Sequence, residues 1–144
     1  TNSKSTQVAD DQAAGIDVTT GPTFKDYKGV RIGMTADEVR QKLGTPELMD
    51  KTEDLFLISD VEIVQVVYDN DGKVSVVSIT YSGNNDAAPT ALDVLGEEVA
   101  AGADGRVYKL VRYPTAGYWV AYSRAAGDEP AVSVTMKKMQ AIPR

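Results

Sequence analysis

The feature that most constrains this chain is a short segment that contains every signal of one helix and then recurs further along the sequence. Thr35 is an N-cap residue whose hydroxyl can accept a hydrogen bond from the backbone N–H of Glu38, and the Glu38 carboxylate can bond back to the backbone of Thr35. Gly44 favours the left-handed backbone that ends a helix, and Pro46 prevents the helix from resuming. These signals predict a helix over residues 36–43.

A second copy of the pattern appears when the sequence is aligned with itself at an offset of 55 residues. The offset aligns a helix cap, a turn glycine and a strand together, which is the mark of an internal repeat. The aligned positions are Thr35 with Thr90, Val39 with Val94, Leu55 with Leu110, Gly72 with Gly127, and residues 77–80 with 132–135. A shift of one residue is needed to align Tyr68 with Tyr122. We infer an internal duplication, with chance similarity of two unrelated α+β halves as the alternative.

Hydrophobic periodicity and turn residues divide each half into one helix and three strands. The predicted elements are strands at 54–59, 62–68 and 73–82 with a hairpin at 69–72, a linker at 82–89, a helix at 91–101, and strands near 106–113, 117–123 and 131–139. Residues 24–32 are predicted to be a short helix or a turn.

The alternation of apolar residues with serine and threonine predicts which face of each sheet is wet. Val77 and Ile79 alternate with Ser78 and Thr80, and residues 132–136 follow the same phase. Each sheet is therefore expected to bury one face under a helix and to expose the other. The predicted fold class is α+β, a single domain over residues 24–144 made of two tandem helix-plus-antiparallel-sheet repeats, at about 30–84 and 85–139.

Composition excludes several kinds of site. The chain has no cysteine and no histidine, which rules out histidine-based triads and thiolate zinc sites, and we expect no cofactor and no metal. A net charge of −6 argues against a nucleic-acid partner, and no apolar run is long enough for an integral membrane segment. Residues 1–23 are polar and are predicted to be a disordered tether left after removal of a leader, with an arbitrary chain boundary as the alternative.

Charge and aromatic residues divide unevenly along the chain. Residues 1–103 carry eight Lys or Arg against eighteen Asp or Glu, whereas residues 104–144 carry seven against three. Under the shifted alignment Trp119 takes the place of Gln65, which lies on the polar face of its strand, so we expect Trp119 to point outward. A lone tryptophan is also a common core residue, and that alternative stays open. The predicted binding site is an aromatic, basic patch for an acidic loop of another protein, made of Trp119, Tyr113, Arg112, Arg124 and Lys137.

Two other patterns are weaker signals of chemistry. Residues 69–72, Asp-Asn-Asp-Gly, contain part of a calcium loop, but valine and serine stand where its first acid and its closing glutamate are required, so a hairpin turn is favoured. Three pairs of adjacent carboxylates are candidates for acid/base chemistry, although such pairs are usually solvated or complement a helix N-terminus. They are Asp37 with Glu38, Glu53 with Asp54, and Glu97 with Glu98.

The pattern Gly-Met-Thr-Ala-Asp-Glu-Val and Leu-Gly-Thr-Pro within residues 33–46, followed by β-hairpins, resembles the SmpA/OmlA family of small outer-membrane lipoproteins. The tandem arrangement of helix and antiparallel sheet resembles the secreted β-lactamase inhibitory proteins. These resemblances imply an extracytoplasmic protein, secreted, periplasmic or envelope-tethered, that is not an enzyme and binds another protein on its sheet. The alternatives are a structural lipoprotein of an envelope assembly complex and a small carboxylate-based hydrolase.

Overall fold

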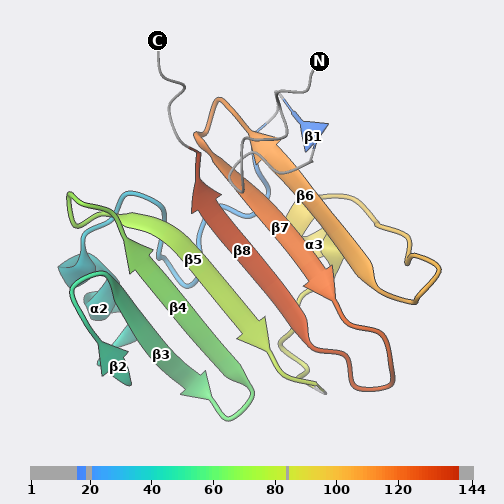
Figure 1. Ribbon diagram of the computed structural model, residues 1–144, viewed down its shortest axis with the longest axis horizontal. Helices are drawn as coiled ribbons and strands as arrows, with labels where there is room; N and C mark the ends of the chain where they lie inside the picture. The colour runs from blue at the N-terminus through green and yellow to red at the C-terminus, as the bar shows by residue number, and fades with distance from the viewer. Residues whose placement is uncertain (1–15, 19–20, 84, 140–144) are drawn as a thin grey trace.

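The chain forms one sheet of eight strands, in the order β1-β6-β7-β8-β5-β4-β3-β2 (Figure 1). The computed structural model describes residues 16–18, 21–83 and 85–139. All neighbouring strands run antiparallel except β1, which is parallel to β6. The elements are β1 (Ile16–Asp17), α2 (Ala36–Leu43), β2 (Leu48–Met49), β3 (Glu53–Ser59), β4 (Glu62–Tyr68), β5 (Val74–Tyr81), α3 (Ala91–Leu95), β6 (Val107–Tyr113), β7 (Tyr118–Arg124) and β8 (Val132–Lys138).

The two halves of the chain meet at the pairing of β5 with β8, which lie side by side in the middle of the sheet (Figure 1). Ile79 lies directly opposite Val134, and both side chains are fully buried. The sequence predicted one sheet for each half, and this expectation is wrong because the last strand of each half hydrogen-bonds to the other. The result is a single continuous sheet.

Helix α2 begins and ends where the sequence predicted. The Thr35 hydroxyl accepts from the backbone N–H of Glu38 at 3.2 Å, the Glu38 carboxylate accepts from the backbone N–H of Thr35 at 2.9 Å, and the Gly44 N–H closes the last turn on the carbonyl of Arg40. Bonds from Thr35 lower the pKa of Glu38. Val39 is the fully buried residue of this helix, which fixes the face that it turns to the sheet.

Helix α3 starts as predicted but is much shorter than residues 91–101. Thr90 and Asp93 form a capping box with bonds of 3.0 and 3.1 Å. Gly96 then takes the left-handed conformation, with φ of 79°, and its N–H bonds to the carbonyl of Leu92. Because glycine adopts this conformation without steric cost, the helix ends after Leu95.

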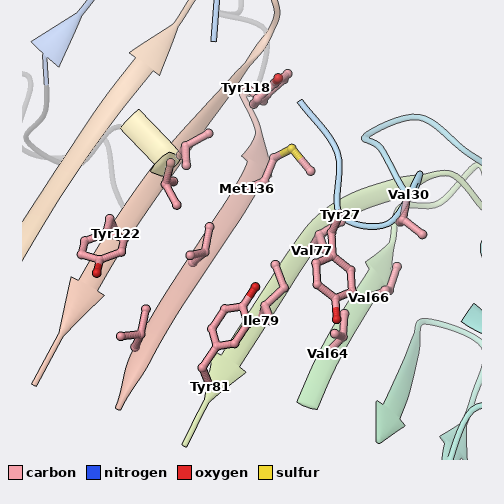
Figure 2. Close-up of a cluster of buried hydrophobic side chains, with 14 of the residues drawn as sticks. Tyr27, Val30, Val64, Val66, Val77, Ile79, Tyr81, Tyr118, Tyr122 and Met136 are labelled. Carbon is pink, nitrogen blue, oxygen red and sulfur yellow. The ribbon is translucent and has the colours of Figure 1, made fainter. Parts of the chain in front are cut away.

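Both helices cover the same face of the sheet. In Figure 1 they lie on its far side. Val39 of α2 and Val94 of α3 belong to one buried cluster with the inward side chains of the strands. Figure 2 shows the middle of that cluster, in which Val77, Ile79 and Met136 lie between the tyrosines of the two halves. A cluster that crosses the β5–β8 pairing makes the chain one domain rather than two.

One N-terminal segment differs from its prediction, and the next adopts one of the two conformations predicted for it. Ile16 and Asp17 lie within the predicted tether, yet they form a strand beside β6. The predicted disorder is therefore wrong for these residues, whereas residues 1–15 and 19–20 lie outside the described chain. Residues 24–32 form a turn and not a helix, in which Tyr27 and Val30 exchange two backbone hydrogen bonds and are both buried.

The strand register also corrects the alignment of the two halves. Ile79 pairs with Val64 on β4, and its counterpart Val134 pairs with Tyr122 on β7. Tyr122 therefore takes the place of Val64 and not of Tyr68. Val64 and Ile79 are 15 residues apart whereas Tyr122 and Val134 are 12 apart, so the β4–β5 hairpin is three residues longer than the β7–β8 hairpin.

Two buried carboxylates lie on the helix-covered face. Asp54 is fully buried and accepts two bonds of 2.9 Å from the Arg40 guanidinium and one of 2.7 Å from the Tyr68 hydroxyl. Glu62, which is 7% exposed, accepts from the Tyr27 hydroxyl. Burial and these bonds raise the pKa of both tyrosines, so the phenols stay protonated and donate. The contacts tie α2 and the N-terminal turn to β3 and β4.

We expect Thr35→Ala to lower the free energy of unfolding by about 1 kcal/mol, because it removes the N-cap bond of α2. Urea denaturation of the full chain measures this change. Gln41→Ala, on the exposed side of the same helix, is the control and should change stability by less than about 0.5 kcal/mol. Equal stability of Thr35→Ala and the wild type would mean that the cap contributes nothing.

Asp54→Asn is expected to cost about 2–3 kcal/mol, because it leaves the Arg40 guanidinium without its bidentate partner next to the core. Glu53→Gln changes the neighbouring carboxylate, which is exposed, and should cost less than about 0.5 kcal/mol. Comparing the free energies of unfolding of the two variants distinguishes the loss of a buried, paired carboxylate from the loss of a negative charge alone. Similar losses for both would contradict the role given to the Asp54 contacts.

Candidate binding face of the sheet

The face of the sheet opposite α2 and α3, which we call the open face, carries neither helix (Figure 1). In β4 and β8 every second side chain is buried against the helices, and the residues between them lie on the open face. Three rows of directly paired residues cross it. They are Glu53, Val67, Val76, Lys137, Trp119 and Arg112; Leu55, Gln65, Ser78, Thr135, Ala121 and Leu110; and Leu57, Ile63, Thr80, Ser133, Ser123 and Tyr108.

The centre of the open face is a band of hydroxyl side chains without charge. Its members are Ser78, Thr80, Ser123, Ser133 and Thr135. The Ser78 and Thr135 hydroxyls lie 3.3 Å apart across the β5–β8 pairing. Each hydroxyl can both donate and accept, so this band can hydrogen-bond to a partner without the cost of burying an ion.

Apolar side chains lie at both ends of the hydroxyl band. On the β3 side Leu57 is 52% exposed, and Leu48 of β2 is 63% exposed. On the β6 side Tyr108 is 59% exposed. Water solvates the exposed apolar ends poorly, so a partner that covers them gains free energy while it hydrogen-bonds to the polar centre.

Three of the predicted site residues come together on the open face. Trp119 lies directly between Arg112 on β6 and Lys137 on β8. Strand alternation places Trp119 opposite the core-facing Val120, which agrees with the predicted outward direction. These three residues form the row nearest the β4–β5 hairpin.

The other two predicted residues, Tyr113 and Arg124, lie on the helix-covered face. Tyr113 is 3% exposed and belongs to the core, where burial raises its pKa and its ring contacts that of Tyr118. Arg124 is exposed at the end of β7 beside Tyr122. Their place in a common patch with Trp119 is therefore wrong, because alternate positions of a strand point to opposite faces.

Trp119 is only 8% exposed, so the expectation of a freely exposed anchor is also wrong. Its directly paired neighbours are an arginine and a lysine, whose long stems can pack on an adjacent aromatic ring. The indole Nε1 is buried, and no described residue accepts its hydrogen bond. An unsatisfied buried donor costs about 1–3 kcal/mol, so this N–H favours an acceptor wherever one is offered.

The positive charge of the second half is partly neutralised by ion pairs. Arg112 Nε bonds to Asp17 of β1, and Lys109 Nζ bonds to Glu97 at 2.8 Å. The basic patch that the sequence predicted is therefore less positive than the residue count implies.

Four of the six adjacent carboxylates that were candidates for acid/base chemistry make structural contacts. Glu38 belongs to the cap of α2, and Glu97 is paired with Lys109. Glu53 accepts from the Gln65 amide on the open face, whereas Asp54 is buried on the other face. The two members of this last pair cannot act on one substrate, because the sheet lies between them.

Residues 69–72 form the hairpin turn that was favoured over a calcium loop. The Asp69 carboxylate accepts from the backbone N–H groups of Asp71 and Lys73, which lowers its pKa, and Gly72 has φ of 75°. Within the described ranges no cluster of three acidic side chains is placed to hold a metal ion.

Two open hollows lie outside the hydroxyl band. The larger, of about 540 Å³, lies between α3, the linker before it and the ends of the last three strands, and Arg124 lines it. The smaller, of about 480 Å³, lies beside Leu48 and Leu55. Strand β2 at Leu48–Met49 was not predicted from the sequence. The pair of apolar residues between Glu47 and Asp50 was the signal that could have indicated it.

Comparison with protein-family models, with curated proteins and with solved structures finds no match for this chain. The helices of the described chain, α2 and α3, are too short to cross a bilayer.

We expect the fluorescence of Trp119 to be blue-shifted and poorly quenched by acrylamide, because the indole is 8% exposed. Trp119→Phe keeps most of the packing and removes the unpaired donor, so it should leave stability within about 1 kcal/mol of the wild type. Trp119→Ala should lose about 3 kcal/mol by cavity formation. Red-shifted emission that acrylamide quenches freely would contradict the burial.

Proposed function

We propose that this chain is an extracytoplasmic protein-binding module without turnover, which holds another protein against the open face of its sheet. The observation that supports it most is the surface itself. Three registered rows of side chains cross six strands; two of them have an uncharged centre, and one of these ends in the exposed Leu57 and Tyr108. Depletion of charge at the centre is what distinguishes the core of a protein interface. The extracytoplasmic location rests on the resemblance of residues 33–46 to the SmpA/OmlA lipoproteins.

The row of Arg112, Trp119 and Lys137 supports an acidic loop as the partner's contact there. Arg112 and Lys137 flank the Trp119 ring and carry the positive charge that an acidic loop would meet. Aromatic and arginine side chains are also the residue types that contribute most to binding at interfaces. The indole Nε1 is itself buried, and Arg112 shares its charge with Asp17, so the support for an acidic contact comes from the row as a whole and not from a single donor.

We also propose that the fold arose by duplication of one helix and three strands. The β5–β8 pairing supports this, because Ile79 lies opposite the residue 55 positions later, Val134, and the pairs on either side follow the same two-fold relation. Both halves also begin with a capped helix. The offset between β4 and β7 is three residues larger than that between β5 and β8, which is consistent with a change of hairpin length in one half.

Capture from an envelope extract tests the binding face with matched variants of the full chain. Thr80→Arg and Thr135→Arg place a bulky charge in the hydroxyl band, and Leu92→Arg places the same charge on the exposed side of α3. We expect the two open-face variants to lose captured protein by about tenfold or more, and Leu92→Arg to retain it.

Equal capture by all three variants, with folding confirmed by circular dichroism, would exclude the open face as the docking surface. Release of a small product from envelope material by the wild type, lost in Glu98→Gln, would favour the hydrolase alternative instead.

A further inference from the structure

The edge of the sheet at β3 is only partly covered. β2 spans two residues, whereas β3 spans seven. The carbonyls of Glu53 and Leu55 accept from the backbone N–H groups of Asp50 and Glu47 at 2.9 and 2.6 Å, so these two residues direct their backbone groups outward. Leu57 follows in the same alternate position, before the bulge that ends the regular pairing with β4. No described residue pairs with the backbone of Leu57 across this edge.

β2 itself is weakly held. Both of its side chains are mostly exposed, Leu48 at 63% and Met49 at 56%, so neither contributes to the core. A two-residue strand without buried side chains opens locally at little free-energy cost. With β2 displaced, Glu53, Leu55 and Leu57 would each present one N–H and one C=O to an incoming strand.

Apolar and acidic side chains surround this edge. Leu48, Met49 and Leu57 are three of the five large hydrophobic residues that are exposed in the described chain. The hollow of about 480 Å³ opens beside them. Residues 45–60 also carry four exposed carboxylates against one exposed cation; they are Glu47, Asp50, Glu53 and Asp60 against Lys51.

From these features we propose that the β3 edge is a second docking site, which takes an extended segment of a partner protein as an added strand in place of β2. Strand addition to a sheet edge is an established mode of peptide recognition. Glu47 and Asp50 flank β2 and would move with it, whereas Glu53 and Asp60 stay at the two ends of β3. Their charge favours a segment in which Lys or Arg alternates with apolar residues. The site uses the backbone groups of the edge rather than the hydroxyl band, although Leu48 and Leu57 border both surfaces, and it does not depend on the function proposed for the open face.

The same charges disfavour a second copy of this chain as the occupant. A symmetric pairing of β3 with its counterpart would place like-charged carboxylates of two copies side by side. Exposed edges often pair between copies when nothing opposes the pairing, and the negative charge of this edge supplies such an opposing force.

Titration of the isotope-labelled full chain with a synthetic peptide of alternating lysine and valine tests the proposal. We expect the amide resonances of residues 53–59 to shift and hydrogen exchange at Leu57 to slow by about tenfold or more on saturation. A peptide with glutamate in place of lysine, and a lysine peptide N-methylated on the edge-facing amides, should each bind at least about tenfold more weakly.

Leu57→Lys and Leu92→Lys form the matched pair of protein variants, since the two leucines are 52% and 46% exposed. Leu57→Lys should weaken binding of the lysine peptide about tenfold or more, and Leu92→Lys should leave it unchanged. Thr135→Arg should also leave it unchanged, which separates this site from the open face. Equal binding of the glutamate peptide, shifts centred on Ser78 and Thr135, or dimerisation through β3 would each overturn the proposal.

Discussion

The structure depends on the hydrogen-bonded pairing of β5 with β8. It joins two three-stranded units, each of which would otherwise end in an unpaired edge, and it places Ile79 and Val134 at the centre of one core. Because both helices pack on the same side of this joined sheet, neither covers the opposite side (Figure 1). The binding surface is therefore a consequence of how the halves join rather than of any single residue.

Buried polar contacts determine which face is covered. Asp54 and Glu62 are the buried charged residues of the described chain, and both lie on the helix side. Their partners reach in from α2 and from the turn at residues 27–30. A carboxylate removed from water is stable only with such partners, so a sheet with its helices on the other face would leave both unpaired. Specific bonds and apolar packing thus favour the same arrangement.

Local signals in the sequence predicted most helices and strands, but no local signal indicated which distant strands pair. The cap at Thr35 located α2, and alternation located β3, β4 and β5 to within about one residue. The pairing of β5 with β8 joins strands far apart in the chain, so no local pattern reports it. The predicted alignment of β7 with β4 was wrong by four residues, yet it assigned Trp119 to the correct face. Side chains alternate between faces along a strand, so an error of an even number of residues does not change the predicted face. Its burial depends on neighbours from two other strands, which the sequence of β7 alone does not reveal.

The central claim is that β5 and β8 join the halves with an uncovered face above them. The double variant Ser78→Cys/Thr135→Cys tests it directly, because the native chain has no cysteine and the two hydroxyls lie 3.3 Å apart. If β5 and β8 pair as described, we expect mild oxidation to form an intramolecular disulfide. If the face is uncovered, we expect a bulky thiol reagent to modify both cysteines rapidly in the reduced, folded protein. Failure to form the disulfide, or protection of both thiols from the reagent, would contradict the central claim.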